Sequence, residues 1–248
     1  MIVSVGHGVN LLVIDAHAHI GGPPLDAEPA NFVRLLKRSG INKAIVCRYI
    51  PRRPTLVGNQ LIHSAIRKYP NNLVGFVWIN PNDEGAQQEI RTCVEGWGFR
   101  GIKLHLEMEP TSVDRLGKVF KEAEKFHIPL YVHVGDNFEL INRLCEKYAV
   151  NIIIGHLGTG VYELNPKRLK KALRLSRKHD NVYLETSGNT YFFIKYSLRE
   201  LGPLKIIFGS DFPHEHPLVL VRAIETLDLT NRDKTQILEG NIRKLVKF

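Results

Sequence analysis

The chain has 248 residues, a formal net charge of +9, and 44% hydrophobic and 24% charged residues, which is the composition of an ordinary soluble globular protein. No apolar stretch approaches the roughly 18 residues of a membrane span. The N-terminus also lacks the basic and then apolar order of a signal peptide. We therefore expect a cytoplasmic protein with no membrane partner. The length suits a single domain over residues 1–248, close to the roughly 250 residues of a barrel of alternating strands and helices.

The three cysteines, Cys47, Cys93 and Cys145, are far apart and form no Cys-x-x-Cys pair. This spacing argues against a disulfide framework and against a cysteine zinc site. We interpret them as small buried apolar residues in a reducing compartment.

Positive charge is densest between Lys167 and Lys178, a stretch with helical spacing whose apolar residues occupy another face. The net charge raises the question of nucleic acid, but the stretch lacks the interleaved aromatic residues on which single strands stack. We interpret it as the solvated face of a helix and predict no nucleic-acid contact.

Apolar runs recur along the chain, and segments with helical periodicity separate them. The first expected strand starts at Leu11 and closes with His17 and His19. Further strands are expected over residues 43–50, 73–79, 101–106, 129–134, 151–155, 182–186 and 205–209. Helices are expected between the strands, with Ser112 as one N-cap, and helical sequence continues after residue 213.

These repeated strand–helix units predict an α/β protein with a single (β/α)8 TIM barrel. The strands are continuous apolar runs, which is typical of parallel strands buried on both faces. No Gly-x-Gly-x-x-Gly follows a strand, and this disfavours an open dinucleotide-binding sheet. Strand-to-helix connections are longer and more polar than helix-to-strand connections, and barrel enzymes carry their active sites on the longer set.

Chemically capable side chains gather at the predicted strand ends. Alternation along a strand places His17 and His19 on one side. The full set is His17, His19, Lys103, His105, His133, His156 and Asp211. A single histidine at a strand end is more often a hydrogen-bonded residue than a ligand, and Asp211 alone could be an N-cap. Their coincidence at one barrel mouth favours a metal site, because imidazole nitrogens and a carboxylate oxygen suit Zn²⁺, Mn²⁺, Fe²⁺ or Co²⁺.

Several stretches together resemble the amidohydrolase superfamily. They are residues 14–19, 101–105, the strand that carries His133, residues 155–158 and residues 208–213. The resemblance covers nearly the whole chain. It is best to the amidohydrolase-2 branch, which includes aminocarboxymuconate-semialdehyde decarboxylase and related hydrolases. It implies a metal-dependent barrel enzyme.

Residue by residue, the resemblance implies that His17, His19, His133 and Asp211 hold one divalent metal ion, with Zn²⁺ as the first expectation and Mn²⁺, Fe²⁺ or Co²⁺ as alternatives. It implies that His156 is the catalytic histidine facing the bound water and the substrate. Asp211 would also accept a proton from that water.

Three further residues are expected to contact the substrate. Binuclear members of the superfamily bridge two metals through a carboxylated lysine or a glutamate on strand four. Lys103 could therefore be such a bridge, or an ammonium that pairs with a substrate carboxylate. His105 shares its face, and Arg48 ends strand two and could bind an anionic group. Glu185 and Ser187 on strand seven are candidates for supporting contacts.

The function predicted from these features is a metal-dependent hydrolase that directs a metal-activated water at a small carbonyl-containing substrate. The alternative is a metal-dependent non-oxidative decarboxylase on the same scaffold. TatD-like nucleases also share the barrel and the His-x-His motif. They usually carry a glutamate on strand four, where this chain has Lys103 and His105. We expect a small-molecule substrate, and the sequence leaves a homo-oligomer open.

Overall fold

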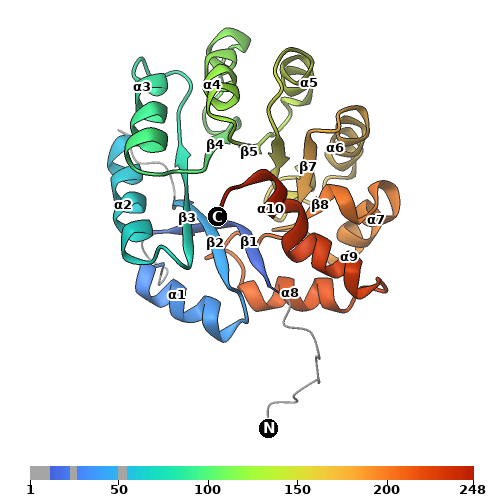
Figure 1. Ribbon diagram of the computed structural model, residues 1–248. Coiled ribbons are helices and arrows are strands. Elements are labelled where there is room, and N and C mark those ends of the chain that lie inside the picture. Colours follow the sequence, from blue (N-terminus) through green and yellow to red (C-terminus); the bar gives the residue numbers. More distant parts are fainter. Residues whose placement is uncertain (1–11, 23–26, 50–54) are drawn as a thin grey trace.

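The computed structural model describes residues 12–22, 27–49 and 55–248. Its strands follow one another around a single sheet in the order β1 to β8, every neighbouring pair is parallel, and helices surround the strands (Figure 1). The fold is the predicted (β/α)8 TIM barrel. Within the described residues, no helix combines the length and the apolar character needed to cross a membrane. The N-terminal residues on which the signal-peptide expectation rests lie outside the described part.

The strands are β1 (Ile14–Ile20), β2 (Lys43–Arg48), β3 (Leu73–Trp78), β4 (Gly101–His105), β5 (Leu130–His133), β6 (Ile152–Ile154), β7 (Val182–Glu185) and β8 (Ile206–Ile207). The helices are α1 (Pro29–Arg38), α2 (Thr55–Lys68), α3 (Ala86–Arg91), α4 (Val113–Phe126), α5 (Phe138–Lys147), α6 (Pro166–Lys178), α7 (Tyr191–Leu201), α8 (Pro217–Glu225), α9 (Asn231–Thr235) and α10 (Asn241–Leu245).

Two apolar clusters hold the barrel together. The larger cluster fills the space between the strands and the surrounding helices. The smaller one lies inside the barrel, where Ile14 and Ile207 pack against Ile242 and Leu245 of α10. Figure 1 shows α10 lying across the centre of the ring of strands. Because Ile14 is the first residue of β1, α10 covers the amino end of the barrel. The carboxyl ends of the strands are left to form the mouth.

The barrel closes between its last and first strands through backbone contacts. Asp211 N–H donates to the carbonyl of His17 at 2.7 Å, and His19 N–H donates to the carbonyl of Phe212 at 2.6 Å. Asp15 reinforces the seam, because its carboxylate accepts hydrogen bonds from the backbone N–H and the hydroxyl of Ser210 at 2.9 and 2.6 Å. This seam places β1 next to the segment that follows β8, so residues from both segments form one site.

The predicted elements match the observed ones except near their ends. β1 begins at Ile14 and runs through both histidines to Ile20, so His17 and His19 lie inside the strand rather than closing it. The reason is that β2 and Phe212 provide backbone partners on both sides. β8 is shorter than predicted and covers only Ile206–Ile207, and Asp211, farther along the chain, has a left-handed conformation. Ser112 caps α4 as predicted, accepting from the N–H of Arg115.

Candidate metal and active site

The two histidines of β1 converge on one carboxylate. His17 Nε2 is 3.5 Å and His19 Nε2 is 3.1 Å from the same oxygen, Oδ1 of Asp211. All three side chains are buried, so strand alternation does place both imidazoles on one side. The other carboxylate oxygen, Oδ2 of Asp211, is buried and has no hydrogen-bond partner within the described residues. A buried acceptor without a partner is costly and points to a ligand that the polypeptide does not supply.

His156 adds a third ligand-type side chain to this cluster. One potential ligand atom from each of His17, His156 and Asp211 lies within 4.8 Å of the others. His156 follows β6 with φ +57°, and Asp211 follows β8 with φ +56°. A residue other than glycine costs about 1–2 kcal/mol in this left-handed region. Such strain gathers at functional sites, where the surrounding structure holds it in place.

Lys103 brings a positive charge into the same cluster. Its side chain is buried, with Nζ 3.0 Å from His17 Nε2 and 4.1 Å from the centre of the Tyr131 ring. An ammonium can only donate hydrogen bonds, so the Nε2 lone pair of His17 accepts from it, and a bound metal ion would have to replace this hydrogen bond. The free Asp211 oxygen and these imidazole nitrogens form a donor set that fits a divalent transition metal.

Burial sets the charges of these groups. Desolvation, followed by the charge of Lys103, holds the pKa of His17 well below its usual range. Desolvation also lowers the pKa of His156 to about 4, although Asp211 opposes the shift, and it lowers the pKa of Lys103. Burial disfavours charge on His19 too, but Cys47 and Asp211 outweigh it and raise its pKa to about 10. His17 and His156 are therefore neutral at physiological pH.

Asp211 remains ionised beside them. Burial opposes its charge, but the hydrogen bond with His19 and the nearby His156 hold its pKa below the usual range. The site is therefore a buried carboxylate flanked by the neutral imidazoles of His17 and His156, which is the protonation state that a metal requires of its ligands. His19, whose pKa is raised, would have to lose a proton to bind a metal.

His133 lies next to this cluster but faces elsewhere. Its ring is 5.0 Å from that of His156, and it stacks on His105 with centroids 3.9 Å apart. Its Nε2 is hydrogen-bonded to Glu107 at 2.8 Å, and Glu107 is held in turn by Arg168 at 2.9 Å. Among the described residues, the groups that could hold a metal do not include His133. Its role as a ligand stays a prediction.

A comparison with known protein families identifies the family of the chain. The amidohydrolase model of the amidohydrolase-2 family matches residues 14–248. The chain belongs to the amidohydrolase-2 family.

Individual relatives of this amidohydrolase-2 chain are distant. The γ-resorcylate decarboxylase of Rhodococcus jostii (strain RHA1) is 21% identical over 248 residues, which cover 77% of this chain and 75% of the relative. A dihydroxybenzoic acid decarboxylase from Polaromonas sp. JS666, solved with bound manganese and the inhibitor 2-nitroresorcinol, has a TM-score of 0.73 and 18% identity, covering 94% of this chain and 96% of that one. A 5-carboxyvanillate decarboxylase from Sphingomonas paucimobilis has a TM-score of 0.73 and 16% identity, covering 95% and 98%. These solved structures confirm the barrel.

Two predicted substrate contacts of the amidohydrolase-2 chain lie at the rim of the mouth. His105 ends β4, and its Nδ1 accepts from the N–H of Met108 at 3.2 Å. Arg48 ends β2, and its backbone carbonyl accepts a hydrogen bond from His19 Nδ1 at 2.9 Å. The aliphatic stem of Arg48 packs beside Gly58 of α2, where a Cβ would come within 3.2 Å. Whether these side chains bind substrate stays a prediction.

Three residues that contact the site were not predicted from the sequence. Tyr131 lies 2.6 Å from His17 Nδ1, and the alternation that links it to His133 along β5 was the available signal. Cys47 places its sulfur 3.2 Å from His19 Nδ1, so it is more than an apolar filler. Glu107 occupies a turn after β4, where strand periodicity gives no signal. Its side chain fits because Gly135 has no Cβ, which would lie 2.3 Å away.

Part of the basic face of α6 is paired with neighbouring carboxylates. Arg168 pairs with Asp136 at 2.7 Å, and Lys178 pairs with Glu146 at 2.6 Å. Ion pairs of this kind leave less positive charge for phosphates. They agree with the interpretation of a solvated helix face, and the absence of nucleic-acid binding stays a prediction.

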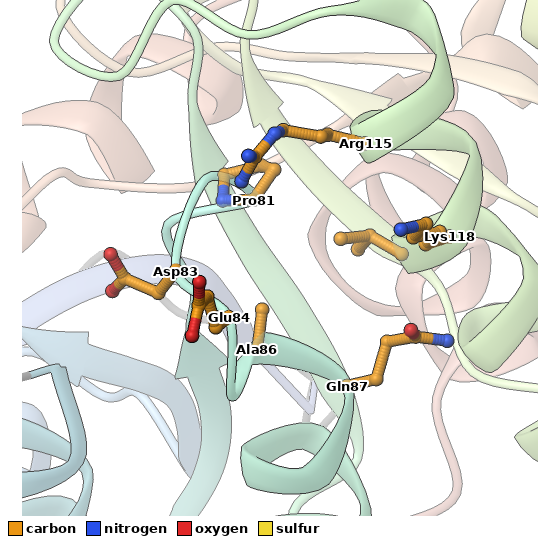
Figure 2. Close-up of a pocket in the computed structure, with 8 residues that line it drawn as sticks. Pro81, Asp83, Glu84, Ala86, Gln87, Arg115 and Lys118 are labelled. Atoms are coloured by element: carbon orange, nitrogen blue, oxygen red, sulfur yellow. The ribbon is translucent and has the colours of Figure 1, made fainter.

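A separate groove of about 240 Å³ lies between the loop after β3 and helix α4 (Figure 2). Its lining is charge-balanced, with Asp83 and Glu84 on one side and Arg115 and Lys118 on the other. It includes no predicted site residue and does not add to the chemistry of the barrel mouth.

Proposed function

We propose that this chain is a metal-dependent decarboxylase that removes the carboxyl group of a small aromatic acid without oxidation. The observation that carries the metal site is the buried convergence of His17 and His19 on one oxygen of Asp211, whose other oxygen has no partner among the described residues. The relatives named above are decarboxylases, which supports this alternative over the hydrolase that the sequence favoured. The manganese in the Polaromonas structure makes Mn²⁺ the first metal to test, ahead of the expected Zn²⁺.

The mouth has surfaces that suit such an acid. Trp78 is buried and lies nearly parallel to His105, with centroids 6.1 Å apart and an interplanar angle of 11°. Aromatic side chains at the strand ends are suitable neighbours for an aromatic ring in offset-stacked or edge-to-face contact. Lys103 provides a buried positive charge for a carboxylate or a phenolate.

In the proposed reaction the bond between the ring carbon and the carboxyl carbon breaks, CO₂ leaves, and the ring carbon takes up a proton. A bound divalent ion would supply Lewis-acid stabilisation of negative charge on a substrate oxygen. His156, neutral because burial lowers its pKa to about 4, accepts the proton of a substrate hydroxyl. Asp211, ionised beside it, takes over this proton and delivers it to the ring carbon as CO₂ leaves, and the phenolate product regains a proton from water.

The experiment incubates the purified chain, loaded with Mn²⁺ or Zn²⁺, with 2,6-dihydroxybenzoate, with 5-carboxyvanillate and with a panel of simple amides and lactones. We expect CO₂ release from at least one aromatic acid, loss of that release on chelation, and one deuterium on the vacated ring carbon in D₂O. Hydrolysis of an amide or lactone without CO₂ release from any acid would instead establish the hydrolase. A reaction that survives full metal removal would contradict both.

A further inference from the structure

A buried tyrosine–glutamate pair lies directly beneath the candidate metal site, and the proposed reaction does not use it. Tyr131 of β5 is 1% exposed and Glu185 of β7 is fully buried. Tyr131 Oη donates to Glu185 Oε2 at 2.6 Å and lies 2.6 Å from Nδ1 of His17. His17 therefore has this pair on its Nδ1 side and Asp211 on its Nε2 side.

Every hydrogen-bonding neighbour of Glu185 is a donor. Besides Tyr131, the backbone N–H and the hydroxyl of Ser187 donate to it, the hydroxyl at 2.8 Å, and the N–H of His156 donates at 3.3 Å. Backbone N–H groups cannot accept, and an ionised carboxylate is an acceptor only. The single hydroxyl proton of Tyr131 therefore points at Glu185. The Tyr131 oxygen is left to accept from His17, which places a proton on His17 Nδ1.

The contacts of Nε2, on the opposite edge of the His17 ring, independently indicate the Nδ1–H tautomer. Lys103 Nζ lies 3.0 Å from His17 Nε2. An ammonium has three donors and no acceptor, so this neighbour requires a lone pair on the nitrogen. The acceptor Oδ1 of Asp211 lies farther from the same nitrogen, at 3.5 Å. Both edges of the imidazole thus assign the Nδ1–H tautomer.

Two glycines leave the space that the pair occupies. A Cβ on Gly155, directly after β6, would lie 2.4 Å from the Tyr131 hydroxyl oxygen. A Cβ on Gly209, after β8, would lie 2.4 Å from Glu185 Oε1. Contacts this short do not occur between real side chains, so any larger residue would displace the pair. The space for the pair on β5 and β7 is therefore provided by the ends of β6 and β8.

We propose that Tyr131 and Glu185 are positioning residues that hold His17 in its Nδ1–H tautomer and so direct its Nε2 lone pair into the metal site. The expected change in metal affinity rests on the proposed function, because it assumes that His17 binds a metal. The expected tautomer of His17 does not. Removing a hydrogen-bond partner behind a metal-binding histidine typically weakens metal binding about 10–100-fold. We expect a loss in this range for Tyr131→Phe, which removes one oxygen and keeps the ring.

The primary test reads the tautomer directly in the full-length chain after metal removal, by long-range ¹H–¹⁵N spectra of the histidine rings. His156 is an internal reference, because its Nδ1 lies 3.2 Å from the backbone carbonyl of Ser187 and is held without Tyr131. In the wild type we expect both rings as Nδ1–H. In Tyr131→Phe we expect His17 to move towards the Nε2–H form while His156 is unchanged. Tyr183→Phe, on the same strand as Glu185, is the matched control and should change neither ring.

The second readout is the dissociation constant for Mn²⁺ and Zn²⁺, measured by competition with a chelator. A wild-type His17 protonated on Nε2 would overturn the proposal, and so would a folded Tyr131→Phe whose His17 signals and metal affinity match the wild type. Weaker metal binding with an unchanged tautomer would also overturn it, since only packing would then have changed. If Tyr131→Phe does not fold, Glu185→Gln must show the same His17 shift. The tautomer result is independent of whether the chain decarboxylates anything.

Discussion

Substitution of His156 tests the site in two ways, because the imidazole ring and the backbone conformation of this residue lead to separate predictions. Replacement by alanine or by glycine removes the same imidazole, so both variants should lose about 10²–10⁴-fold in kcat, the usual contribution of a positioned acid or base. Both should keep the metal content of the wild type if His156 acts in chemistry more than in metal binding. Elemental mass spectrometry measures the metal, and the CO₂ assay measures the rate.

The two variants should differ in stability. The backbone of His156 has φ +57° and ψ +35°, which costs a residue with a Cβ about 1–2 kcal/mol. Glycine escapes that cost but loses about 0.4–1 kcal/mol through the greater freedom of its unfolded chain. The net advantage of His156→Gly over His156→Ala is then about 1 kcal/mol, or roughly 2–4 °C in Tm for a chain of this size.

Calorimetry on the two metal-free variants makes the comparison. An alanine variant that melts as high as the glycine variant would refute the strain argument. A variant that keeps wild-type turnover would refute the catalytic role. If the wild type binds two metals and the variants bind one, His156 is instead a ligand of a second ion, and Lys103 becomes the candidate for its carboxylated bridge.

Three other predictions concern neighbouring positions. Burial lowers the pKa of His156 to about 4, below the roughly 6.5 of an unfolded histidine. The unfolded chain therefore takes up the proton first, and stability should fall as the pH drops from about 6.5 towards 4. His156→Gln should reduce that slope in denaturant titrations. His133→Ala should abolish stoichiometric metal in elemental analysis, and full retention would remove it from the ligand set. Gly209→Ala should lower both Tm and metal affinity by displacing Glu185, whereas Gly96→Ala, with open space around it, should lower neither.

The architecture was predictable because most strand residues are apolar and the segments between the strands have helical periodicity. Residues near strand ends were predictable as a group, since parallel strands deliver their carboxyl ends to one mouth. His17, His19, His156 and Asp211 meet there as expected.

The direction in which each side chain points was not predictable. His133 shares the mouth but bonds to Glu107, a residue on a turn whose position follows from no periodic pattern. Tyr131 reads in the sequence as one more apolar strand residue, and only the fold shows its hydroxyl against His17. The positions of strand ends in the sequence predict which residues reach the mouth of the barrel. The hydrogen-bond partners of those residues depend on packing between strands that are distant in sequence.

The seam between β8 and β1 means that the site forms only when the last strand of the barrel has paired with the first. Asp15 and Ser210, which join across it, are 195 residues apart. During synthesis, His17 and His19 are therefore made long before Asp211. A barrel that lacks β8 and the segment after it does not contain all of the metal-binding side chains. Metal taken up by the finished protein favours the closed form by mass action, by about 2.7 kcal/mol when free metal is at 100 times its dissociation constant. An ion held by His17, His19 and Asp211 would then connect the two sides of the seam.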